Sequence, residues 1–227
     1  LNNTFFDTTR GNIEFGGATA IDLLNEDGKN PALIADFKGN MDLKALEATI
    51  AKVGVENIPM VMITVTNNTG GGQPVSMENI RETSKICKKH GIPFFLDCCR
   101  FAENCYFIKQ REKGYENKTV LEIAQEMFSY ADGATMSAKK DGMANTGGFV
   151  ACHSDELAQK LRTNLIVTEG FLTYGGLARR DLEALAIGFE EVMNEDYLRY
   201  RIEQINDLGK MLTDAGVPIL MPTGGHA

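Results

Sequence analysis

The chain has 227 residues, of which 43% are hydrophobic and 24% are charged, and its formal net charge is −8. This length and composition fit one substantial globular domain with a sizeable apolar core. The negative charge argues against nucleic acid and anionic membranes as partners, and the longest apolar runs are too short to span a bilayer. The five cysteines are an odd number without framework spacing, which indicates reduced thiols and a cytoplasmic location.

Hydrophobic periodicity and turn residues predict strands and helices that alternate along the chain. Residues 1–17 are expected to form loop or short strand, and Asp42, Ser76 and Thr119 are expected helix caps. In chain order the further elements are a strand at 18–24, a helix at 43–53, a buried strand at 59–65, a helix at 76–90, a strand at 92–96, helices at 101–112 and 119–130, strands at 134–136 and 148–152, a helix at 155–162, amphipathic helices at 182–192 and 198–212, and a strand at 217–220.

Strands that alternate with helices predict an α/β fold, with a mostly parallel sheet flanked by helices and an antiparallel strand at 148–152. In such sheets ligands bind beyond the carboxyl ends of the strands. Three polar segments are expected at that edge, because residues 67–72, 97–100 and 137–140 each follow a predicted strand directly. Their shared position indicates one ligand site.

Two adjacent lysines, Lys139 and Lys140, follow the short strand that ends near Ser137. A neighbouring cation favours the neutral form of a lysine amine. A neutral amine can attack a carbonyl carbon and form an imine, and pyridoxal phosphate is the commonest partner in that chemistry. Either lysine could serve, and the alternative for both is an exposed basic turn.

Pyridoxal phosphate also needs a carboxylate at its pyridine nitrogen, donors for its phenolate oxygen and ligands for its phosphate. Asp97, at a predicted strand end, suits the pyridine nitrogen. Asn68 and Arg100 could converge on the phenolate oxygen. Ser137 and Lys139 suit the phosphate. These assignments make pyridoxal phosphate the cofactor that the residue types favour.

Each of these residues also has a purely structural interpretation. Asp97 could cap a helix, and Arg100 could form an ion pair on the surface. Asn68 could belong to a simple glycine turn. Phe6 could lie over the cofactor face or could be part of the core. The residues alone leave these alternatives open.

Eight stretches spread along the chain carry a more specific pattern. They are residues 5–10, DFKGN at 36–40, GGQPVS at 71–76, RFAENCYFIKQ at 100–110, MFSYAD at 127–132, MSAKKD at 136–141, EGFLTYGGL at 169–177 and GGHA at 224–227. Together they resemble the pyridoxal-phosphate-dependent β-eliminating lyases, the family of tryptophanase and tyrosine phenol-lyase. The resemblance implies an aspartate-aminotransferase-like large domain of fold type I, a pyridoxal phosphate cofactor, activation by potassium, an amino-acid substrate and a homotetramer.

The resemblance also implies a role for most of the residues above. Lys140 matches the Schiff-base lysine and catalytic base, and Lys139 and Ser137 match its phosphate-side neighbours. Asp97 matches the partner of the pyridine nitrogen, and Asn68 and Arg100 match the ligands of the ring oxygen. Phe6 matches the stacking aromatic residue, and Asn145 matches a monovalent-cation position that binds through its backbone carbonyl. Family members are about twice as long as this chain. Residues 1–227 are therefore expected to form an incomplete cofactor-binding domain, without an N-terminal segment and a C-terminal small domain.

Asp7 bears on the substrate, because tryptophanases resemble this chain in having Phe-Asp-Thr-Thr here and phenol-lyases have threonine. An acidic acceptor suits the indole N–H, whereas a hydroxyl suits a phenol. Residues 174–187, by contrast, resemble the phenol-lyases. We expect β-elimination of L-tryptophan to indole, pyruvate and ammonia. The alternatives are elimination of phenol from L-tyrosine and a catalytically silent scaffold, and the fragment alone is expected to be inactive.

Overall fold

The computed structural model describes residues 1–173 and 175–226. At the centre of this part lies a four-stranded sheet in the order β1-β2-β3-β4. Its strands are β1 (Val61–Thr64), β2 (Phe94–Asp97), β3 (Gly133–Ser137) and β4 (Gly148–Cys152). The first three strands are parallel and β4 is antiparallel to β3. The predicted α/β class, the mostly parallel sheet and the antiparallel fourth strand are thus confirmed.

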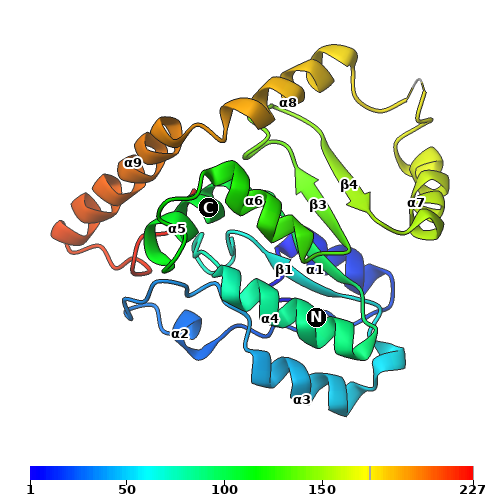
Figure 1. Cartoon of the computed structure of the whole chain (residues 1–227), viewed down its shortest axis with the longest axis horizontal. Coiled ribbons are helices and arrows are strands. Elements are labelled where there is room, and N and C mark those ends of the chain that lie inside the picture. The colour runs from blue at the N-terminus through cyan, green and yellow to red at the C-terminus, as the bar shows by residue number, and fades with distance from the viewer. Residues whose placement is uncertain (174, 227) are drawn as a thin grey trace.

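Helices surround this sheet (Figure 1). They are α1 (Asp7–Phe15), α2 (Glu26–Lys29), α3 (Leu43–Val53), α4 (Met77–His90), α5 (Phe101–Arg111), α6 (Val120–Ser129), α7 (Asp155–Thr168), α8 (Arg179–Glu191) and α9 (Glu195–Asp214), with a 3-10 turn at Val55–Asn57. Helix α4 packs on α3, α6 and β2, while α7 lies beside β4 and α9 beside α5. None of the helices in the described residues is long and apolar enough to cross a membrane.

The apolar core lies around β1 and β2, whose residues are all buried. Ile63 and Leu96 from these strands pack in one cluster with Ile80 of α4 and Ile123 of α6. Each fully buried side chain of this size stabilises the fold by roughly 1.5–3 kcal/mol. Strand β4 is largely exposed, so the sheet is covered well at the β1–β2 side and poorly at its β4 edge.

Side-chain caps begin the helices where the sequence predicts them. The Asp42 carboxylate accepts a hydrogen bond from Ala45 N at 2.9 Å, and the Ser76 hydroxyl accepts one from Asn79 N at 3.1 Å. Thr119 starts α6 with a complete capping box, in which the side chain of Glu122 accepts from Thr119 N. Such caps each contribute about 1 kcal/mol, because they satisfy amides that have no partner within the helix.

Two predictions near the N-terminus were wrong. Residues 7–15 form helix α1, although none of its residues is buried and its sequence therefore carries no apolar stripe. Residues 18–24 form isolated bridges only, at Asp22 with Asn2 and at Leu24 with Met41. One reason is that the side chain of Asn3, and not the backbone of a neighbouring strand, accepts the hydrogen bond of Thr64 N at 2.9 Å.

The strand predicted at residues 217–220 is also absent. The chain that follows is bound by side chains of distant loops instead of a sheet. Lys38 Nζ donates to the carbonyl oxygen of Met221, and Gln73 Nε2 donates to that of Pro222 at 2.6 Å. Apolar β-branched residues here suggested a strand, but no strand edge lies beside them to complete a ladder.

Candidate active site

A cavity of about 1080 Å³ opens where the parallel strands end. Thr64, Asp97 and Ser137, the last residues of β1, β2 and β3, all line it. The sequence-predicted residues in its lining are Phe6, Asn68, Asp97, Arg100, Ser137, Lys139 and Lys140. Asp7 and Asn145 are exposed and do not belong to the lining. The structure therefore gathers the predicted cofactor ligands in one place, while the predicted substrate and cation residues lie outside it.

Lys140 lies in the tight turn after β3. Its Nζ atom donates a hydrogen bond to the Ser137 hydroxyl at 2.9 Å, which directs the amine back toward the strand end. Lys140 is half-buried, whereas Lys139 is exposed. The turn itself is closed by Ala138 N to Gly147 O at 3.0 Å and by Met143 N to Lys140 O at 3.0 Å. Of the two lysines, Lys140 is the one whose amine is held in place.

Cys99 joins the lysine turn to the end of β2. Its Sγ atom accepts a hydrogen bond from Ser137 N at 3.1 Å, and its carbonyl oxygen accepts one from Asp141 N at 3.2 Å. Burial raises the pKa of the Cys99 thiol to about 12, and the nearby Asp97 carboxylate adds to the shift. The thiol stays neutral near pH 7, so Cys99 acts as a structural link and not as a nucleophile.

Asp97 is buried at the end of β2, where its backbone carbonyl accepts a hydrogen bond from Val65 N at 2.9 Å. Its carboxylate accepts a long hydrogen bond of 3.4 Å from Cys99 N. The alternative role as a helix cap is wrong, because α5 begins after Arg100 and has no side-chain cap. The carboxylate is left to face the cavity.

Arg100 is buried as well, and the surface ion pair that the sequence allowed is not found in the described residues. The Asn68 amide is assigned with its oxygen toward the guanidinium, at 3.1 Å from Nη1 and 3.2 Å from Nη2. The buried Nε atom of Arg100 has no partner among the described residues. Buried donors are normally satisfied, so this site has room for an acceptor from a bound group.

A cluster of buried charges lies directly behind the lysine turn. Asp141 accepts hydrogen bonds from Ala102 N at 2.8 Å and Glu103 N at 3.3 Å, at the start of α5. Arg201 of α9 contacts Asp141 at 3.1 Å and Glu103 at 2.7 Å. His226 N also donates to Glu103 at 3.1 Å. Both carboxylates are fully buried, and the Arg201 guanidinium bridges them and connects α9 to the residue after Lys140.

This cluster makes stability depend on pH. Burial raises the pKa of Asp141 from 3.8 to about 7, the Glu103 carboxylate adds to the rise, and Arg201 opposes it. The folded chain thus keeps a proton that the unfolded chain loses at lower pH. The resulting stabilisation is complete below the unfolded pKa and is lost as pH rises toward about 7.

We expect the free energy of unfolding of the wild-type chain to fall between about pH 4 and about pH 7 relative to Asp141→Asn. The difference should be about 2–4 kcal/mol, since each pKa unit corresponds to about 1.4 kcal/mol. Urea unfolding of both chains across this range measures it. If the difference in free energy of unfolding between the wild type and Asp141→Asn does not change with pH, the raised pKa of Asp141 is contradicted.

The sequence missed several residues that line the cavity. Thr8 and Thr9 of α1 and Thr135 of β3 add hydroxyl groups, and Phe149 and Leu172 add apolar surface. The two threonines lie in the Phe-Asp-Thr-Thr stretch, which could have identified them. Leu172 lies in the stretch 169–177, which could likewise have identified it, whereas Phe149 carries no signal of its own because only the fold brings β4 to this edge.

The fold class is defined by solved structures. Aminotransferase AspB from Helicobacter pylori superposes on 93% of this chain and 50% of its own chain, with a TM-score of 0.56 and 18% sequence identity. The SepCysS–SepCysE N-terminal domain complex superposes on 99% of this chain and 55% of its own, with a TM-score of 0.65 and 15% identity. These likenesses show an aminotransferase-like fold, as the sequence resemblance implied.

The family is defined by sequence. The profile of the family described as beta-eliminating lyase matches residues 1–224. Tryptophanase from Salinibacter ruber is 57% identical over 99% of this chain and 48% of its own length. Tyrosine phenol-lyase from Symbiobacterium thermophilum is 48% identical over 99% of this chain and 49% of its own. The chain belongs to the β-eliminating lyase family and spans about half the length of these relatives.

Pyridoxal phosphate is the cofactor expected of this family, and the residues of the cavity fit it. A fixed lysine amine, a buried carboxylate at a strand end and a buried guanidinium belong to residues that line one space. These are the groups that the aldehyde, the pyridine nitrogen and the ring oxygen of the cofactor require. The donor set therefore suits this cofactor and no residue in it opposes binding.

Proposed function

We propose that the chain is the cofactor-binding part of a longer β-eliminating lyase that converts L-tryptophan and water to indole, pyruvate and ammonia. The observation that carries the proposal is the meeting of seven predicted cofactor residues in one cavity at the ends of β1, β2 and β3. The 57% identity to a tryptophanase supports the choice of reaction. Residues 1–227 are then an incomplete large domain, which is why the chain covers about half of its relatives.

In this proposal Lys140 has two tasks. Its amine, held 2.9 Å from the Ser137 hydroxyl, would hold the cofactor through the aldehyde group, with release of water. Once the amine of the substrate had taken its place there, the Lys140 amine would be free to accept the α-proton of the substrate. Bound pyridoxal phosphate supplies an electron sink for the charge left at the α-carbon. The short reach from the turn to the strand end keeps the amine near the reacting carbon throughout.

The other residues orient the cofactor. The Asp97 carboxylate holds the proton on the pyridine nitrogen, and Arg100 with Asn68 binds the ring oxygen. Ser137 and Lys139 hold the phosphate at the same strand end. Preorganised charges of this kind act strongly because the surrounding core excludes water. Phe6 packs on one face of the ring, since it is the half-buried aromatic residue at the entrance to α1.

Two further parts of the proposal follow the family resemblance. Asn145 contributes a backbone carbonyl to a monovalent-cation site, and potassium activates the enzyme. The whole protein is a cytoplasmic homotetramer. The five cysteines of this chain, which form no disulfide in the described residues, suit a reducing compartment. A silent scaffold is less well supported, because no cofactor ligand type is missing from the cavity.

Tyrosine phenol-lyase remains the second candidate. Residues 174–187 resemble that enzyme, although Tyr174 lies outside the described residues and only the remainder can be placed, in the loop and α8. Leu177 and Leu182 from this stretch line the cavity. The phenol-lyase alternative thus concerns residues that could contact the aromatic ring of the substrate.

The variant Asp7→Thr separates the two candidates. Asp7 is exposed between the lining residues Phe6 and Thr8, and in this proposal its carboxylate accepts the indole N–H in the whole protein. The variant should then lower kcat/KM for L-tryptophan by about tenfold or more. Release of indole and of phenol, each measured with its own amino acid, gives the preference directly.

A matched control is Asp155→Thr, because Asp155 is likewise the exposed first residue of a helix, α7. It should leave both rates unchanged. If Asp7→Thr leaves the ratio of indole to phenol release at its wild-type value, Asp7 does not determine the substrate preference. If the wild-type protein releases phenol faster than indole, the phenol-lyase alternative replaces the proposal.

A further inference from the structure

Helix α1 is positioned without help from the core. It carries Thr8 and Thr9 of the cavity, and Phe6 is its N-cap residue. None of its residues is buried, so no apolar face anchors it. A helix of this kind keeps its place through polar contacts and through the chain that enters it. The contacts made around Phe5 and Arg10 therefore decide where Phe6 lies.

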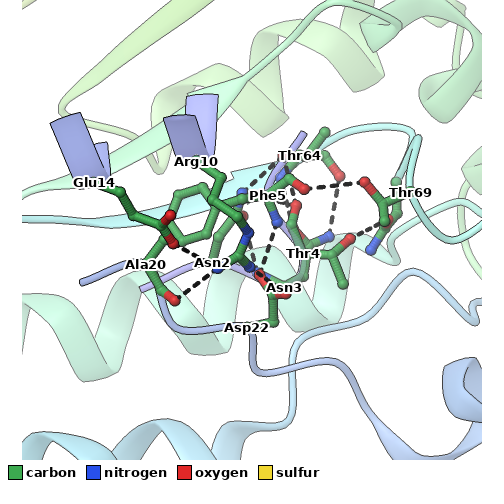
Figure 2. A network of polar contacts seen from close by, with 11 residues as sticks. Asn2, Asn3, Thr4, Phe5, Arg10, Glu14, Ala20, Asp22, Thr64 and Thr69 are labelled. Atoms are coloured by element: carbon green, nitrogen blue, oxygen red, sulfur yellow. Dashed lines mark hydrogen bonds and ion pairs between the residues drawn. The ribbon is translucent and has the colours of Figure 1, made fainter. Parts of the chain in front are cut away.

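The peptide groups of Phe5 are held on both sides (Figure 2). Asp22 Oδ1 accepts a hydrogen bond from Phe5 N at 2.9 Å. Thr69 Oγ1 donates one to the carbonyl oxygen of Phe5 at 3.0 Å. That carbonyl belongs to the peptide bond between Phe5 and Phe6, so the hydroxyl of Thr69 fixes the orientation of the residue that enters α1.

The second oxygen of Asp22 reaches the helix itself. Arg10 Nη2 lies 2.6 Å from Asp22 Oδ2, and Arg10 Nη1 donates to Ala20 O at 3.1 Å. The guanidinium also lies 5.9 Å from the centre of the buried Phe5 ring. One carboxylate thus binds both the chain before Phe6 and the second turn of α1, which a lone surface ion pair would not do.

Thr69 connects this segment to the loop after β1. It directly follows Asn68, whose amide oxygen faces Arg100. The loop is closed by Gly71 N to Asn68 O at 2.9 Å and by Gly70 N to Asn67 Oδ1 at 3.0 Å. One hydrogen bond thereby joins Thr69, the neighbour of Asn68, to Phe5, the neighbour of Phe6.

We infer that Asp22 and Thr69 are positioning residues that hold Phe6 against the cofactor ring and at a fixed position relative to Asn68. This inference rests on the proposed function. Neither side chain belongs to the lining of the cavity. Their effect on the cofactor would pass through the backbone of Phe5, so it should appear in the geometry of binding before it appears in the stability of the fold.

The test compares how the wild-type, Thr69→Val and Thr69→Ser proteins bind pyridoxal phosphate. Two quantities are measured for each protein: the dissociation constant and the visible circular dichroism of the bound cofactor. Thr69→Val should weaken binding about 3- to 10-fold and change the dichroism band, because the part-buried hydrogen bond to the Phe5 carbonyl oxygen is lost. Thr69→Ser should restore both. Asp22→Ala, which removes two contacts, should weaken binding by at least as much.

Two controls carry matched changes far from the site. Thr213→Val removes a hydroxyl that donates to Gly209 O at 2.8 Å, and Asp214→Ala removes a carboxylate that pairs with Lys210 at 2.6 Å. Both should bind the cofactor as the wild type does. Wild-type affinity and an unchanged dichroism band in Thr69→Val and Asp22→Ala would overturn the inference.

A second measurement needs no cofactor. Amide hydrogen exchange of the peptide that covers residues 1–10 should be at least about 3-fold faster in Thr69→Val and Asp22→Ala than in the two controls, since both changes free the Phe5 peptide groups. Failure of the wild-type protein to take up the cofactor would count against the proposed function, and the exchange rates would still decide this inference. Equal exchange in all variants would overturn it.

Discussion

Replacing Lys140 by alanine is expected to abolish covalent cofactor binding and to lower β-elimination by the whole protein by at least about 10³-fold. The size of the effect follows from the two tasks of the amine, since a positioned general base alone contributes about 10²- to 10⁴-fold. Lys139 is a poor substitute, because it is exposed, whereas the Lys140 amine is held at the strand end by donating to the Ser137 hydroxyl at 2.9 Å. Release of pyruvate from the amino acid measures the loss.

Lys139→Ala is the informative comparison, because it removes the adjacent amine and keeps Lys140. It should retain the covalent link and bind the cofactor more weakly, as expected for the loss of one phosphate ligand. If Lys140→Ala keeps the link and Lys139→Ala loses it, the roles of the two lysines are reversed. Elimination activity retained by Lys140→Ala would remove the basis of the proposed mechanism.

The largest expected effect on stability comes from Arg201→Ala. This change removes the guanidinium that the buried carboxylates of Glu103 and Asp141 share, and it leaves the His226 ring 3.0 Å from Glu103. Removal of one partner from a buried ion pair typically costs about 3–5 kcal/mol. For a chain of this size the Tm should fall by about 6–20 °C. The loss should be smaller in acid, where burial keeps Asp141 protonated because its pKa is raised to about 7.

Arg199→Ala provides the control on the same helix. Arg199 pairs with Asp196 at 2.8 Å, but both side chains are more than half exposed, at 55% and 81%. An exposed pair contributes about 0–1 kcal/mol, so this variant should unfold close to the wild type. Calorimetry of both variants at about pH 5 and about pH 7.5 separates the charge effect from lost packing. Equal losses in Arg199→Ala and Arg201→Ala would contradict the role of the buried cluster.

Much of the fold could be predicted because its signals are local. The apolar runs of β1 and β2, the caps at Asp42 and Ser76 and the capping box at Thr119 each depend on neighbouring residues only. The strand predicted at 217–220 failed for the opposite reason. The two residues that follow it, Met221 and Pro222, are bound by the side chains of Lys38 and Gln73, which lie more than a hundred residues away.

The candidate site divides in the same way. Asp97, Ser137 and Lys140 could be predicted, because each stands at or just after a strand end, where ligands of parallel sheets bind. The pairing of Arg201 with Asp141 could not, since an arginine on an amphipathic helix gives no sign of a partner that lies 60 residues away. Thr69 was hidden as well, because its function depends on which chain segment crosses its hydroxyl.

The most direct test of the account is the identity of the lysine that binds the cofactor. The whole protein would be incubated with pyridoxal phosphate, reduced with borohydride and digested, and the modified peptide would be located by mass spectrometry. The account predicts one added group, on Lys140, in the peptide that contains Met136–Asp141. A label on any other lysine, or no label on a folded protein, would contradict it.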